Sequence, residues 1–175
     1  KNVKNIPIFQ NSSTWHDILT QVYPFHPVSL YGLPRLSSRL AQNERTLFNF
    51  LVSEDPLGFK RYLSRTKVES DTLPSMTFDT VVDYFLYGSR FASWSPDIRK
   101  SISQLESALE RLGDRPPLEE KIIKILGGIR LLRCGPALPS NTDTLKACLN
   151  INTIPENKSF DDAISNLIEH KLIVY

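Results

Sequence analysis

Apolar residues recur along this chain at the three- and four-residue spacing of an α-helix, and this period constrains the fold more than any other feature. The most regular stripe consists of Ile98, Ile102, Leu105, Leu109 and Leu112. It begins just after Pro96 and ends just before Gly113, which are residue types that open and close helices. The stripe spans only two heptads, fewer than the three or four typical of a coiled coil. It therefore predicts a helix of a packed bundle over residues 96–112.

The same period predicts further helices between residues 12 and 95. Their apolar sets are Trp15, Ile18, Leu19 and Val22; Val28 to about Leu40; Leu47, Phe48, Phe50 and Leu51; Leu57 and Leu63; and Phe78, Val81, Val82, Phe85 and Leu86. Pro34 lies inside the second of these and should kink or split that helix. Residues 66–76 predict a polar loop.

The last 60 residues change character after a stiff break at residues 114–117. Pro117 opens a helix that contains Gly127-Gly128, a costly pair that indicates close approach of another backbone. Capping boxes are suggested by Ser140-x-x-Asp143 and Ser159-x-x-Asp162, and each would open a helix. Residues 172–175 predict a β-strand. Helix, helix, helix and strand follow the order of a winged helix whose wing is cut short.

The predicted fold class is therefore all-α, with a helical bundle over residues 1–115. A winged-helix-like three-helix unit with a short C-terminal strand is expected over residues 116–175. The first residue is Lys1 and not an initiator Met, so we expect a fragment of a longer protein.

Composition excludes several classes of protein. A formal charge of +2, with 41% hydrophobic and 23% charged residues, is typical of a globular domain and not of a disordered or polyanion-coating chain. Cys134 and Cys148 are too few for a disulfide framework and predict free thiols in a reducing compartment. No apolar run reaches the roughly 18 residues of a membrane span, and no signal peptide is evident. We expect a cytoplasmic chain with no membrane partner.

No catalytic motif is present. The chain lacks GxxxxGK[ST], GxGxxG, GxSxG, HExxH and DxDxDG, and its three histidines lie far apart in sequence. The carboxylate pairs at 119–120 and 161–162 fall in first helical turns, where they complement the helix dipole. The sequence predicts no catalytic residue, no metal site and no cofactor of its own. An enzyme with an unrecognised site is the least favoured hypothesis.

Basic residues concentrate in two places. The first group is Arg35, Arg39 and Arg45, and the second is Lys60, Arg61, Arg65 and Lys67. Each group is interpreted first as a solvated helix face. For the first group, an arginine on a helical lid could instead reach the terminal phosphates of a nucleotide held by a neighbouring domain.

The segments Tyr23-Pro24-Phe25-His26-Pro27-Val28-Ser29-Leu30, Leu33-Pro34-Arg35-Leu36-Ser37 and Gln42-Asn43-Glu44-Arg45-Thr46-Leu47-Phe48-Asn49-Phe50-Leu51 carry a resemblance. They resemble a region of large bacterial P-loop ATPases of the AAA+/STAND type, which include defence-associated ATP-binding proteins. The ending Lys171-Leu172-Ile173-Val174-Tyr175 is similar to the start of their wing. Residues 23–51 are the specific part of this resemblance.

The resemblance implies a lid plus a winged helix that follow an N-terminal ATPase core of the same chain. ATP and Mg²⁺ would then belong to the whole protein, and phage defence would be its setting. Pro24 or Pro27 would pack on the nucleotide base, and His26 and Arg45 would reach phosphate. His26 also has the simpler interpretation of a helix cap before Pro27. Without Walker A or Walker B motifs, this chain alone is not implied to hydrolyse ATP.

The last predicted helix decides between two functions. Its buried stripe is expected to be Phe160, Ala163, Ile164, Leu167 and Ile168, and its outward residues Asp161, Asp162, Ser165, Asn166, Glu169 and His170. Three carboxylates on a recognition helix oppose contact with phosphates. We therefore favour a non-catalytic regulatory or interaction module that couples nucleotide state to conformation or assembly, with other protein domains as partners. A DNA-binding winged-helix regulator is the alternative.

Overall fold

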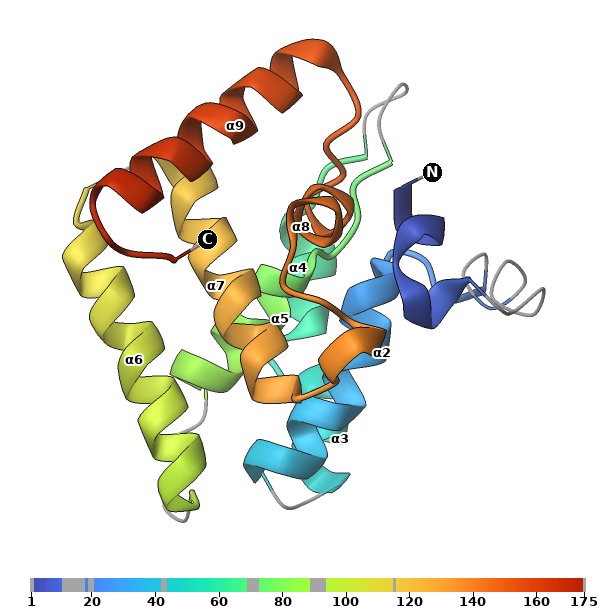
Figure 1. Ribbon diagram of the computed structural model, residues 1–175. Helices are drawn as coiled ribbons and strands as arrows, with labels where there is room; N and C mark the ends of the chain where they lie inside the picture. Colours follow the sequence, from blue (N-terminus) through green and yellow to red (C-terminus); the bar gives the residue numbers. More distant parts are fainter. Residues whose placement is uncertain are drawn as a thin grey trace. The chain divides into compact units, whose positions relative to one another are not determined.

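The computed structural model describes residues 2–10, 18, 21–41, 44–68, 73–88, 94–114 and 116–174, and the chain is mostly helical (Figure 1). Within these residues there are eight α-helices, α2 to α9, and no β-strand. The all-α class is confirmed. The terminal strand is not found, because Leu172 and Ile173 form a bend, Val174 has no regular structure and Tyr175 lies outside the described part. The helix expected around Trp15 also lies mostly outside it.

The chain divides into two compact units. Unit 1 consists of Lys1–Asn11 and Pro96–Tyr175, and unit 2 of Ser12–Ser95. This division does not coincide with the expected boundary at residue 115. The expected boundary falls between α6 (Pro96–Leu112) and α7 (Pro117–Leu132), which pack on each other in the same unit.

Unit 1 is built around α7. The helices α6, α8 (Thr142–Cys148) and α9 (Ile154–Glu169) pack against it, and Figure 1 shows α6 running beside it in the opposite direction. The N-terminal 3₁₀ turns η1 (Asn2–Asn5) and η2 (Pro7–Phe9) contribute to the same unit, η1 against α8 and η2 against η5 (Gly135–Ala137). Its most buried side chains include Ile6, Ile122, Ile125, Leu138, Phe160 and Leu167.

Helix α6 matches its prediction closely. Ile98, Ile102, Leu105 and Leu112 are buried, and Gly113 adopts a left-handed φ of +62° just after the helix. The expectation for Gly127 on α7 needs correction. The group that approaches Gly127 is the Leu105 side chain, not a backbone: a Cβ built on Gly127 would lie 2.6 Å from Leu105 Cδ2. The glycine therefore makes room for an apolar side chain of α6.

The predicted caps of the last two helices are wrong. Helix α8 is capped by Asn141, whose Oδ1 accepts from the Thr144 N–H at 2.9 Å, and not by Ser140. Helix α9 begins at Ile154, well before Ser159, and carries a complete capping box of Thr153 and Glu156. Asn is as good a cap as Ser, and Thr153-x-x-Glu156 matches the capping box better than a motif that ends in Asp.

Unit 2 contains four α-helices in its described residues. They are α2 (Pro27–Leu36), α3 (Glu44–Val52), α4 (Phe59–Arg65) and α5 (Phe78–Asp83). Helices α2 and α5 each continue into a π-helical turn, η3 (Ser37–Ala41) and η4 (Tyr84–Gly88). The change after α2 follows Pro34, which has no N–H to donate. Helix α2 is nevertheless continuous through Pro34 to Leu36, so the expected split at this proline is not found.

Aromatic rings connect the elements of unit 2. Phe25 stacks on Phe59 of α4 and lies near Phe50 of α3, and Phe50 meets Tyr84 of η4 edge to face at 4.8 Å. Phe50 and Tyr84 are almost fully buried, so this series of rings forms much of the core. None of the described helices, in either unit, combines the length and the apolar character that crossing a membrane requires.

Candidate functional site

Residues Tyr23–Pro27 form a turn that is anchored to the start of α5. The peptide bond between Tyr23 and Pro24 is cis. The His26 N–H donates to the Met76 carbonyl at 3.1 Å, and the Met76 N–H donates to the Pro24 carbonyl at 2.8 Å. The Ser29 hydroxyl adds a third bond to the same Met76 carbonyl at 2.7 Å. The turn that carries the candidate residues is therefore held by a segment about 50 residues away along the chain.

His26 acts as the N-cap of α2. Its Nδ1 accepts from the Val28 N–H at 3.3 Å, and Pro27 occupies the first position of the helix. An accepting Nδ1 carries no proton, so the bond selects the neutral ring with its hydrogen on Nε2. The side chain is 2% exposed. The structure therefore supports the cap interpretation and gives no support to direct phosphate contact by His26.

The other predicted nucleotide-sensing residues differ in exposure. Pro24 is buried, Pro27 is half-buried and Arg45 is exposed. Pro24, His26 and Pro27 are brought together by the turn, whereas Arg45 lies on α3, beyond η3. Of the two prolines, Pro27 presents more of its ring to solvent.

The first basic group does not form one cluster of equivalent side chains. The Arg35 guanidinium lies over the Tyr31 ring, 3.6 Å from its centroid, and donates to the Tyr31 carbonyl at 3.0 Å. Arg39 is half-buried in η3. Arg45 lies at the surface on α3, whereas Arg35 and Arg39 lie on α2 and its continuation η3.

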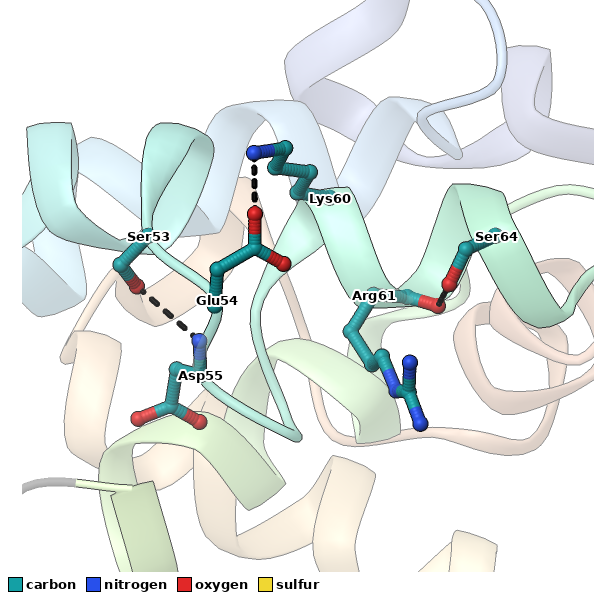
Figure 2. A network of polar contacts seen from close by, with 6 residues as sticks. All are labelled: Ser53, Glu54, Asp55, Lys60, Arg61 and Ser64. Atoms are coloured by element: carbon teal, nitrogen blue, oxygen red, sulfur yellow. Dashed lines mark hydrogen bonds and ion pairs between the residues drawn. The ribbon is translucent and has the colours of Figure 1, made fainter.

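The basic patch, defined as Lys60, Arg61, Arg65 and Lys67, is exposed on and just after α4. Lys60 pairs with Glu54, and Figure 2 shows this contact beside Arg61. The hydrogen bond from Lys60 lowers the pKa of the Glu54 carboxyl, and the charges of Lys60 and Arg61 lower it further. One carboxylate therefore offsets part of the patch's positive charge.

Local hydrogen bonds explain where α4 begins. Asp55 Oδ1 accepts from the Leu57 N–H at 2.8 Å. The Asp55 N–H contacts the Ser53 hydroxyl at 3.4 Å, as Figure 2 shows. Asp55 and Pro56, residue types that can open a helix, lie at the start of a turn here, and the helix starts only at Phe59, after Gly58. Three residues of the basic patch, Lys60, Arg61 and Arg65, therefore lie on this short helix, and Lys67 follows it.

The stack of Phe25 on Phe59, with ring centroids 4.6 Å apart, joins the anchored turn to the helix that carries the basic patch. The sequence does not indicate this link, because no local period connects residues 25 and 59. Nearby, burial raises the pKa of the Tyr62 phenol, with a smaller increase from Tyr23, so Tyr62 stays neutral at physiological pH. The candidate turn and the helix that carries the basic patch are therefore in contact through this pair of rings.

The outward face of α9 is largely as expected. Its predicted outward residues are exposed, and Asp161 pairs with Lys146 of α8 at 3.0 Å. Asn166 donates to Glu119 of α7 at 3.1 Å, so its amide is engaged within unit 1. Two expected core residues differ: Ile168 is exposed and Ile164 is half-buried.

The described residues hold no group of three or more metal-ligating side chains. Cys134 and Cys148 are free thiols, the first partly exposed and the second buried. A scan against protein-family models found no match to the chain, and searches of curated proteins and of solved structures found none either.

Proposed function

We propose that this chain is a non-catalytic regulatory module of a bacterial P-loop ATPase. In this proposal unit 2 is a lid that senses nucleotide bound by an ATPase core, and unit 1 contains the winged-helix-like part that passes the change to other protein domains. The core would precede residue 1 in the same polypeptide. ATP and Mg²⁺ would be held by that core, and phage defence is the biological setting that the resemblance suggests.

The observation that carries the proposal is the contrast between a fixed turn and an exposed arginine. The turn at residues 23–27 is tied to Met76 by two hydrogen bonds, Ser29 of α2 adds a third, and His26 is buried as a cap. Arg45 is exposed on α3. An exposed guanidinium suits recognition of phosphate, because its charge is permanent and its donors are planar.

Within this proposal the predicted residues take different roles. Arg45 contacts the terminal phosphates. Pro27, which is half-buried, packs on the base, and Pro24 is a buried part of the turn. His26 positions the turn and the first residues of α2 without touching the nucleotide.

The test uses the full-length gene product. Arg45→Ala should reduce nucleotide-dependent activity or nucleotide affinity by about tenfold, the usual effect of losing one charge-assisted hydrogen bond. Arg45→Lys should recover only part of the loss. Arg65→Ala, which removes an exposed arginine of the basic patch on α4, is the matched control and should leave both quantities unchanged.

Unchanged activity and unchanged affinity in Arg45→Ala would remove Arg45 from the sensing role. The residues encoded immediately before Lys1 provide a second check. Walker A and Walker B motifs there are expected, and their absence would contradict the ATPase assignment.

DNA binding remains the alternative, and the acidic face of α9 counts against it. Asp161, Asp162 and Glu169 are exposed on the helix that would enter the major groove. Titration of a labelled duplex at physiological salt should give no sub-micromolar binding. Weak binding at low salt should depend on the basic patch and disappear when Lys60 and Arg61 are both changed to Ala. Tight binding that is lost in Ser165→Ala/Asn166→Ala would instead establish a DNA-binding regulator.

A further inference from the structure

Unit 1 contains a cavity of about 620 Å³ between α6 and α7. The loop that follows α7 and residues 172–174 complete its lining. Ligand pockets in proteins commonly fall between about 300 and 1,000 Å³, so this cavity has the size of a small-molecule site. It lies wholly within unit 1, and the inference below does not rest on the proposed function.

The cavity walls are mainly apolar. Helix α6 contributes Leu105 and Ala108, and α7 contributes Ile123 and Leu126. Gly127, which accommodates Leu105, lies on the same face of α7 one turn before Arg130. The apolar part of the wall suits a hydrocarbon or aromatic body.

Charge in the lining has a single sign. Arg130 and Arg133 are its charged residues, and no lining residue is acidic. The Arg133 guanidinium pairs with Asp97 at 2.9 Å. Arg130 is exposed on the last turn of α7, and within the described part of the chain it pairs with no carboxylate. An anionic group at this end of the cavity would meet a guanidinium able to form two parallel hydrogen bonds.

We propose that the cavity between α6 and α7 binds a small amphipathic carboxylate. Its apolar body lies against Leu105, Ile123 and Leu126, and its carboxylate pairs with Arg130. The apolar walls supply affinity by excluding water, and the arginine selects an anion over a neutral molecule of the same shape.

The two cysteines provide a built-in reporter for this site. Cys134 lines the cavity and is partly exposed, whereas Cys148 is fully buried on α8. Iodoacetamide, a neutral reagent, should therefore modify Cys134 much faster than Cys148 in the folded chain. A ligand in the cavity should slow modification of Cys134 and leave Cys148 unaffected.

The experiment compares decanoate with 1-decanol as an uncharged analogue of equal length. Decanoate, below the concentration at which it forms micelles, should protect Cys134 saturably, and decanol should require about a tenfold higher concentration. Amide resonances that shift on addition of decanoate should map to the facing sides of α6 and α7 and to residues 172–174. Absence of saturable protection, or shifts spread over both units, would overturn the proposal.

Variants separate the two parts of the site. Arg130→Gln should weaken decanoate protection to the level of decanol, and Arg99→Gln, an exposed arginine of α6 outside the lining, should not change it. Ala108→Phe should fill the cavity and abolish protection by both ligands. Equal protection in wild type and Arg130→Gln would refute the anion site. The resonance mapping on wild type decides the question if Ala108→Phe does not fold.

Discussion

Gly127 of α7 faces the side chain of Leu105 of α6 so closely that a Cβ on the glycine would lie 2.6 Å from Leu105 Cδ2 and 2.7 Å from its Cδ1. Glycine in a helix interior costs about 1 kcal/mol relative to alanine. Glycine occupies this position despite its lower helix propensity, because α6 and α7 pack closely there. The identity of residue 127 is thus linked to the identity of residue 105.

Gly127→Ala should destabilise the protein by about 1–3 kcal/mol, because the new methyl group forces Leu105 out of its rotamer. The same substitution in a Leu105→Ala background should be neutral or stabilising by up to about 1 kcal/mol, since only the gain in helix propensity remains. Urea unfolding of the four proteins of this cycle measures both effects. The same destabilisation in both backgrounds would show that Leu105 is not the cause.

Thr153→Ala should destabilise α9 by about 1 kcal/mol, because the Thr153 hydroxyl accepts the Glu156 N–H at the helix start. Ser159→Ala is the matched control. Ser159 lies inside α9, its hydroxyl bonds only back to the Pro155 carbonyl, and its loss should change stability little. Thermal unfolding followed by circular dichroism compares the two. A larger loss of stability in Ser159→Ala than in Thr153→Ala would indicate that the helix begins near Ser159, as the sequence predicts.

The contribution of Glu156 should depend on pH. Its carboxylate accepts backbone N–H bonds from Asn152 and Thr153, and these bonds lower its pKa below the ordinary value of 4.5. A lowered folded-state pKa means that the stabilisation is present above pH 4.5 and is lost as the pH falls through the folded value. The stability difference between wild type and Glu156→Gln should therefore shrink on acidification below pH 4.5. A difference that grows on acidification would contradict this assignment.

Two substitutions at His26 separate capping from imidazole chemistry. His26→Ala removes the acceptor for the Val28 N–H and should cost about 1–2 kcal/mol from the cap alone. His26→Asn keeps an acceptor of a preferred cap type and should recover part of that loss. In the full-length protein His26→Asn should also keep nucleotide-dependent activity. Loss of that activity with stability retained would point to a direct role for the ring.

Much of the helical architecture could be predicted because its signals are local. Pro96, Gly113 and the stripe between them defined α6 to the residue, and Phe78, Val81 and Val82 of α5 are buried as their spacing indicates. The start of α9 is also encoded locally, by Thr153 and Glu156, which match the capping box better than Ser159 and Asp162 do.

The remaining features depend on residues far apart in sequence. The pairing of the 23–27 turn with Met76, the stack of Phe25 on Phe59 and the fit of Leu105 against Gly127 have no local signature. For the same reason the sequence could present His26 as a cap or a sensor but could not choose between them. The cavity beside α6 and α7 could not be predicted from local patterns, because its lining comes from two helices, a loop and residues 172–174.

Unit 1 is made of two segments that are far apart in the sequence, so the ribosome synthesises its two parts at different times. Ile6 and Phe9 are buried in a unit whose remaining residues begin only at Pro96. As the chain leaves the ribosome, these two side chains emerge before residues 12–95, and α8 and η5, against which their turns pack, emerge after those residues. Residues 12–95 can condense in the interval, because domains fold as units during synthesis. The segment that carries Ile6 and Phe9 must therefore keep its apolar groups available until α8 has been made.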